Sequence, residues 1–150
     1  MGKKIAIGCD HGGFEMKNEL VDFLKEMGCE VGDFGLIEKA PIDYPIIAEK
    51  VATAVSSGEY ELGILVCGTG IGMSLAANKV KGIRAAVCSE SYSAALTRRH
   101  NNANIIAFGA RVVGVATAEA IVDAFLEAEF EGGRHAARVD LITAIEEGKL

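Results

Sequence analysis

The sequence lacks the segments that mark membrane, secreted and disulfide-stabilised proteins. No apolar stretch in it approaches the roughly 20 residues that cross a bilayer. The N-terminus has no apolar core followed by a cleavage site, as a signal peptide would. The four cysteines show no C-x-x-C spacing, so we expect reduced thiols and no disulfides. These absences favour a cytoplasmic protein without a membrane partner.

Positive charge is also scarce. The 15 Lys and Arg residues against 21 Asp and Glu residues give a formal net charge of -6. Broad nucleic-acid binding needs a basic face, so we expect no nucleic-acid partner. The basic side chains must act locally instead, on a small ligand.

What the sequence does contain is an alternation of short apolar runs and helical patterns. At 150 residues and 50% hydrophobic content, it is long enough for one domain, residues 1–150, with a substantial core. The patterns predict strands at 3–8, 30–34, 63–66, 83–88 and 104–108, and helices at 14–27, 46–55, 73–79, 91–99, 115–130 and 134–147. This order predicts a three-layer doubly wound α/β sandwich, Rossmann-like, with a parallel five-stranded sheet and helices on both faces.

Polar residues follow four of the predicted strands. The four strand ends read Cys9-Asp10-His11, Cys67-Gly68-Thr69, Cys88-Ser89-Glu90 and Gly109-Ala110-Arg111. Ligands of open parallel sheets bind beyond the carboxyl ends of the strands. The sequence therefore predicts a site along that edge.

The stretch 63–79, GILVCGTGIGMSLAANK, is the centre of this predicted site. Gly68, Gly70 and Gly72 allow successive backbone N–H groups to converge on an anion beside the thiol of Cys67. Met73 stands where a dinucleotide fingerprint has its third glycine, and no P-loop Gly-Lys-Ser/Thr follows. Taken alone, the motif also fits a tight strand-to-helix turn with a buried cysteine.

Six separated motifs together resemble one family. They are GCDHGG at 8–13, DYP at 43–45, CGTGIGMSLAANK at 67–79, GIRAAVCSE at 82–90, RRHNNAN at 98–104 and GGRHAARV at 132–139. In this order they resemble the ribose-5-phosphate isomerase B family, within the group that also holds galactose-6-phosphate isomerase subunits. The resemblance implies interconversion of ribose 5-phosphate and ribulose 5-phosphate, in the non-oxidative pentose phosphate pathway, through an enediolate and with no metal or cofactor. A six-carbon substrate, allose 6-phosphate or galactose 6-phosphate, stays open, as does a nucleotide-binding or flavodoxin-like module without catalysis.

The resemblance also implies catalytic roles. Cys67 matches the family's strand-end cysteine and would be the base that moves the proton between carbons. Main-chain N–H groups of Gly68, Thr69, Gly70, Ile71 and Gly72 would stabilise the enediolate. The side chain of Thr69 would contact the sugar, although a helix N-cap is the simpler reading. His100 matches the histidine that protonates the ring oxygen.

Further residues would hold the substrate. Asp10 and His11 match family residues that contact the sugar or its phosphate, and Asn101 would contact a hydroxyl. Asp43, in the DYP motif, would assist proton movement between oxygens, although an aspartate beside prolines usually serves its own turn.

The phosphate would be bound by arginines. Arg134 and Arg138 lie four residues apart on one helical face, and Arg111 follows the last strand. His135 falls on a neighbouring face and is expected to be peripheral. Lys17, like most other lysines and arginines, is expected to be solvated.

Members of the family are dimers or tetramers that share sites between subunits. We therefore expect a homodimer or homotetramer, in which Cys67 and the glycine loop of one copy meet some of His100, Arg134 and Arg138 of another.

Overall fold

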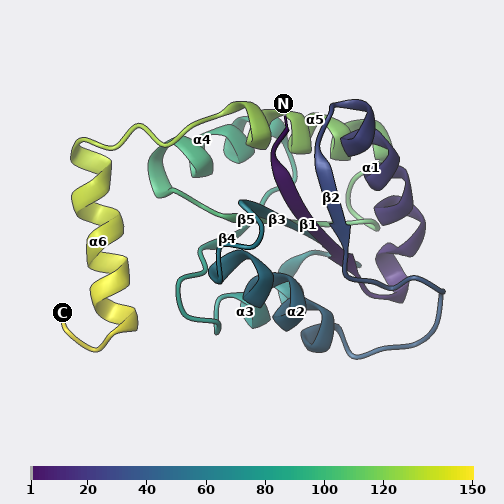
Figure 1. The fold of residues 1–150 in the computed structure, drawn as a ribbon, viewed down its shortest axis with the longest axis horizontal. Coiled ribbons are helices and arrows are strands. Elements are labelled where there is room, and N and C mark those ends of the chain that lie inside the picture. The colour runs from purple at the N-terminus through teal and green to yellow at the C-terminus, as the bar shows by residue number, and fades with distance from the viewer. Residues whose placement is uncertain (1) are drawn as a thin grey trace.

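The fold is built on one parallel sheet, seen edge-on in Figure 1. The computed structural model describes residues 2–150. The strands of these residues are β1 Lys4–Cys9, β2 Glu30–Asp33, β3 Leu62–Cys67, β4 Ala85–Val87 and β5 Ile105–Gly109. They pair in parallel in the order β2-β1-β3-β5-β4. The predicted five-stranded parallel sheet is confirmed.

Helices follow the strands. They are α1 Phe14–Glu26, α2 Tyr44–Ser56, α3 Ile71–Ala77, α4 Ser91–Asn101, α5 Val115–Glu127 and α6 Arg134–Glu146, with a 3-10 turn at His11–Gly13. None of the helices within residues 2–150 has the length and apolarity needed to cross a membrane. The prediction for α5 ran to residue 130 and was too long, because Ala128 is already extended, at ψ 151°. The expected start of α3 at residue 73 was also wrong, since Ile71 and Gly72 form its first turn.

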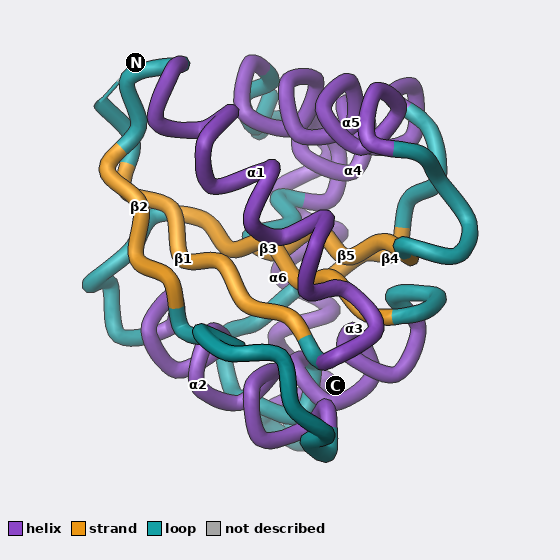
Figure 2. The backbone as a smooth tube through the Cα atoms, turned by 90° about the vertical axis from the view of Figure 1, so that its right-hand side faces the viewer, coloured by secondary structure: helices purple, strands orange, loops and turns teal. Residues whose placement is uncertain are grey.

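Two apolar layers lie on the two faces of the sheet. The layer that holds Ile64 and Val66 of β3 packs against α1, α4 and α5. The layer that holds Leu65 and Cys67 packs against α2 and α3. Figure 2 shows the sheet between these two sets of helices. Alternate side chains of one strand thus enter different cores, as expected for a strand buried on both faces.

Helix α6 stands at one side of the molecule, next to α4 (Figure 1). Its buried residues are His135 and Val139. Three apolar side chains are left in solvent, Leu141 at 50%, Ile142 at 48% and Ile145 at 62% exposure. A helix with so much exposed apolar surface is typical of an interface with another protein.

Lys17 is buried, contrary to the prediction from the sequence. Its side chain is 1% exposed, and Nζ donates to Asp33 Oδ2 at 2.7 Å and to Asn18 Oδ1 at 2.8 Å. The expectation of a solvated lysine was wrong, because this face of α1 turns toward the end of β2. Asp33 Oδ1 in turn accepts from the amide of Gly35, so the ion pair also fixes the start of the loop after β2.

Gly70 offers a test of the turn between β3 and α3. Its φ is +83°, and an added Cβ would lie 2.7 Å from backbone atoms of Phe108. Gly58 has nearly the same φ, +85°, with nothing within 4 Å of an added Cβ. Gly58→Ala should therefore lower the free energy of unfolding by roughly 1–2 kcal/mol, the cost of a left-handed alanine.

Gly70→Ala should lower the free energy of unfolding by roughly 1–3 kcal/mol more than Gly58→Ala, because the methyl group also displaces β5. Urea denaturation of both variants measures the difference. Equal losses would contradict a tight contact between the turn and β5.

Candidate functional site

The carboxyl ends of β1, β3 and β5 lie side by side. Cys9 pairs with Val66, and Cys67 pairs with Gly109, so the residues that follow these strands emerge along one edge. The structure therefore brings together the predicted site residues Asp10, His11, Cys67, Gly68, Thr69, Gly70 and Arg111.

Each glycine of the loop after β3 lies against a different neighbour. Gly70 alone of the three has positive φ and lies against β5. An added Cβ on Gly72 would lie 2.6 Å from the ring of Tyr44, and one on Gly68 would lie 3.7 Å from Arg111 Cδ. The loop is thus packed on three sides, by β5, Tyr44 and Arg111.

The backbone amides of this loop divide into two sets. Gly70 N donates to Cys67 Sγ at 3.1 Å, and Ile71 N donates to Thr69 Oγ1 at 3.2 Å. Within residues 2–150, the amides of Gly68 and Thr69 have no such partner. Two of the amides that were expected to face the substrate are therefore used by the loop itself, and one of them holds the sulfur in place.

Asp10 stabilises the neighbouring turn. Its Oδ1 accepts from the amides of Gly12 at 2.9 Å and Gly13 at 3.2 Å. An added Cβ on Gly12 would lie 3.6 Å from the amide nitrogen of Gly68, so this turn abuts the loop after β3. His11, within the same turn, is exposed. Asp10 is thus a capping residue beside the site.

Helix α2 brings Tyr44 to the site, and Asp43 directly precedes it. Asp43 is the N-cap residue of α2, yet its side chain makes no capping hydrogen bond. Its neighbour Tyr44, 40% exposed, lays its ring against Gly72 in the first turn of α3. Tyr44 was not among the predicted site residues, although the DYP motif contains it.

The remaining predicted residues lie at the opposite edge of the sheet. Helix α4 runs back along β5, and His100 and Asn101 are its last residues. Just beyond them, Asn104 O accepts from the amide of Gly63, near the amino end of β3. The four residue steps of β5 separate this edge from Cys67 by about 13 Å. Within one chain, His100 and Asn101 therefore do not meet Cys67.

The start of α6 lies beside His100 and Asn101. The amide of Glu131 donates to Arg99 O at 3.0 Å, which holds the segment before α6 against the end of α4. Arg134 begins α6, and Arg138 follows one turn later; both are exposed. Arg134 and Arg138 thus lie beside His100, away from Arg111, the third candidate phosphate ligand.

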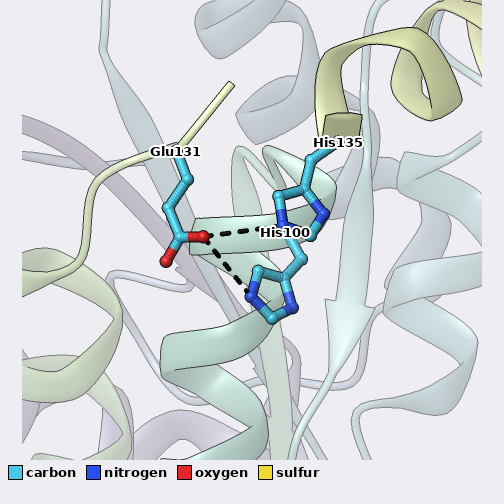
Figure 3. Close-up of side chains that lie close together, drawn as sticks. All are labelled: His100, Glu131 and His135. Atoms are coloured by element: carbon cyan, nitrogen blue, oxygen red, sulfur yellow. Dashed lines mark ion pairs between the residues drawn. The ribbon is translucent and has the colours of Figure 1, made fainter. Parts of the chain in front are cut away.

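His135 proves to be part of this group. Its ring stacks on that of His100, with centroids 4.2 Å apart and an interplanar angle of 9°. Glu131 Oε1 lies 3.7 Å from His100 Nε2 and 3.5 Å from His135 Nε2 (Figure 3). Desolvation lowers the pKa of His135, and the charges of His100 and Arg134 lower it further. The expectation of a peripheral side chain was wrong, because the first turn of α6 folds back onto α4.

The other thiols at strand ends are poor candidates for a base. Burial raises the pKa of Cys9 to about 11 and that of Cys88 to about 11. Cys9 Sγ accepts from the amide of Leu36 at 3.3 Å, which lowers its pKa by less than burial raises it. Burial raises the pKa of Cys29 as well. Cys67 is the cysteine that adjoins the glycine loop.

Comparison with known proteins gives the family. Residues 5–142 match the model of the Ribose/Galactose Isomerase family. The chain therefore belongs to this family of isomerases. Its relatives include ribose-5-phosphate isomerase B of Escherichia coli K12, which is 59% identical over 97% of both chains.

Two further relatives bear on the fold and the substrate. A solved ribose-5-phosphate isomerase B of Clostridium thermocellum superimposes with a TM-score of 0.95, at 57% identity, and covers 98% of this chain and 99% of its own. A D-erythrulose-4-phosphate isomerase of Pectobacterium atrosepticum is 48% identical over 92% of this chain and 91% of its own. Relatives of high identity to this chain are thus named as isomerases of different phosphosugars.

Thiol reactivity tests the choice among the cysteines. At about pH 8, a thiol of pKa about 11 is only roughly one thousandth thiolate, so Cys9 and Cys88 should resist alkylation. Iodoacetamide should inactivate the protein in step with labelling of Cys67, followed by peptide mass spectrometry. Inactivation that tracks Cys9 or Cys88 instead would contradict the assignment of the base.

Proposed function

We propose that the protein interconverts D-ribose 5-phosphate and D-ribulose 5-phosphate through an enediolate, in the cytoplasm and without a metal or cofactor. The observation that carries the proposal is the sulfur of Cys67, held 3.1 Å from the amide of Gly70 in a loop where, among residues 2–150, the amides of Gly68 and Thr69 have no hydrogen-bond partner. A base beside aimed backbone dipoles is what proton transfer next to a carbonyl requires. A nucleotide-binding module without catalysis would not need this thiol.

The carboxyl edge would carry out the proton transfer. Cys67 removes the proton from the carbon next to the carbonyl and returns it to the neighbouring carbon. The amides of Gly68 and Thr69 stabilise the negative oxygen of the enediolate, because fixed dipoles need no reorganisation as the charge appears. Asp43 moves the proton between the two oxygens, and Tyr44 closes the side of the site next to Gly72.

The opposite edge would open the ring and hold the phosphate. His100 protonates the ring oxygen, Asn101 contacts a hydroxyl, and Arg134 and Arg138 bind the phosphate with Arg111 and His11. These groups can act together only if a second copy brings its His100 edge to the Cys67 edge of the first. We therefore propose a homodimer, alone or within a tetramer.

The surface of α6 supports this assembly. A cavity of about 510 Å³ lies between α6 and the end of the sheet. It is lined by Ile142, Ile145, Ile83 and Ala103 among others. The exposed Leu141, Ile142 and Ile145 of α6 are costly in water, and a second copy would cover them. The same contact would place Arg134 and Arg138 near the other copy.

Substrate length is tested by a panel of phosphosugars. Four-, five- and six-carbon aldose phosphates, assayed side by side with chelator present, should give the highest kcat/KM for ribose 5-phosphate. In heavy water, the ribulose 5-phosphate formed should carry deuterium from partial exchange at the migrating hydrogen. A preference for erythrose 4-phosphate or a hexose phosphate would keep the isomerase and change its substrate.

The base is tested by Cys67→Ser. Because proton transfer by a positioned group contributes about 10²–10⁴-fold, kcat should fall by that factor, with KM within a few-fold of wild type. Cys88→Ser is the matched control, since it removes a thiol at another strand end and should leave kcat near wild type. Equal activity of wild type and Cys67→Ser would refute the role of the thiol.

Shared sites are tested by mixing inactive variants. Cys67→Ser and His100→Gln each damage one edge, so a mixed dimer contains one site with both edges intact. Unfolding and refolding an equimolar mixture should restore about a quarter of wild-type activity, since half the dimers are mixed and each has one working site.

The control mixture joins Cys67→Ser with Arg111→Ala. Both variants damage the carboxyl edge, so every site in the mixed dimer keeps a defect, and activity should stay at the level of the separate variants. Recovery in this control, or none in the first mixture, would contradict the sharing of sites between edges.

A further inference from the structure

Three side chains with metal-binding atoms converge where α4 meets the start of α6. His100 ends α4, Glu131 lies in the segment before α6, and His135 lies in the first turn of α6. Figure 3 shows the carboxylate of Glu131 directed at the two imidazoles. The ligand atoms of the three residues all lie within 4.8 Å of one another. Two segments far apart in the sequence thus supply one cluster.

The chemistry of the cluster suits a transition metal. Imidazole nitrogen and carboxylate oxygen are ligands of Zn²⁺, at about 2.0–2.2 Å. Ligand atoms of a tetrahedral zinc site lie about 3.3–3.5 Å apart at these bond lengths. Glu131 Oε1 already lies 3.5 Å and 3.7 Å from the two Nε2 atoms. Because an imidazole binds a metal ion in the plane of its ring, the ring of His100 must turn out of its stack on His135 for all three atoms to meet one ion.

The ligand atoms are also available. Within residues 2–150, neither imidazole takes part in a hydrogen bond, and each has only the longer approach to Glu131. The side chains of Glu131 and His100 are 51% and 37% exposed, so an ion can reach them from solvent. His135, at 11%, supplies the fixed wall of the site. The neighbouring Arg134 repels a cation, and it favours water or an anion as the fourth ligand.

We propose that His100, Glu131 and His135 bind one divalent transition-metal ion, Zn²⁺ or its chemical equivalents, with a fourth position left to solvent. The ion inhibits and is not a cofactor. This consequence rests on the proposed function, in which His100 exchanges a proton with the substrate. A metal on the imidazole of His100 occupies the atom that would carry the proton.

Metal binding can be measured without substrate. The full-length, metal-freed protein is titrated with Zn²⁺ in competition with a chromophoric chelator. One ion per chain should bind, and Glu131→Gln and His135→Gln should each weaken binding at least tenfold. Glu129→Gln, an exposed glutamate of the same segment, is the matched control and should bind as wild type does. Circular dichroism melting shows whether each variant is folded.

Cobalt distinguishes this cluster from the thiols. Co²⁺ bound by nitrogen and oxygen gives visible d–d bands without the ultraviolet charge-transfer band of a cobalt thiolate. That spectrum should appear with wild type and disappear with Glu131→Gln. Equal Zn²⁺ binding by wild type and both ligand variants, or a thiolate spectrum, would overturn the site.

Activity tests the consequence. Zn²⁺ should inhibit wild type and Glu129→Gln at concentrations that fill the site, and Glu131→Gln should need at least tenfold more. Full activity with the site filled would overturn inhibition. Failure of the proposed function would appear separately, as a lack of isomerase activity in the metal-free protein.

Discussion

The close contact between the loop after β3 and strand β5 is the constraint on which the candidate site depends. Gly70 can approach the backbone of Phe108 only without a side chain and with positive φ. This turn directs the amide of Gly70 back to Cys67 Sγ, while the amides of Gly68 and Thr69 have no hydrogen-bond partner among residues 2–150. A bulkier residue at position 70 would shift the loop, and with it both the thiol and the amide donors.

The direction of the helices explains why the site is divided. In a parallel sheet each crossover helix runs opposite to the strands, so its last residues return to the amino edge. Cys67 ends a strand and His100 ends a helix, and they must therefore lie at opposite edges of one chain. Catalysis that needs both groups requires two chains. The fold thus makes assembly a condition of the proposed activity.

The sequence predicted features that depend on local pattern. The five strands follow from apolar runs, and the site at their carboxyl ends follows from the rule for parallel sheets. Lys17 and His135 were missed because their environments come from contacts distant in sequence, with β2 and α4. The engaged amides of Gly70 and Ile71 were missed for another reason: a glycine pattern indicates that amides can converge, and does not show which side chains compete for them.

The attachment of α6 connects substrate binding with the histidine cluster. His135 and Val139 lie four residues apart and are the buried residues of α6. Arg134 directly precedes His135, and Arg138 directly precedes Val139. The side chains of the two arginines therefore point about 100° away from the buried ones around the helix. The stacking of His135 on His100 therefore fixes the direction in which both arginines project. A change at this stack should therefore disturb phosphate binding and His100 together.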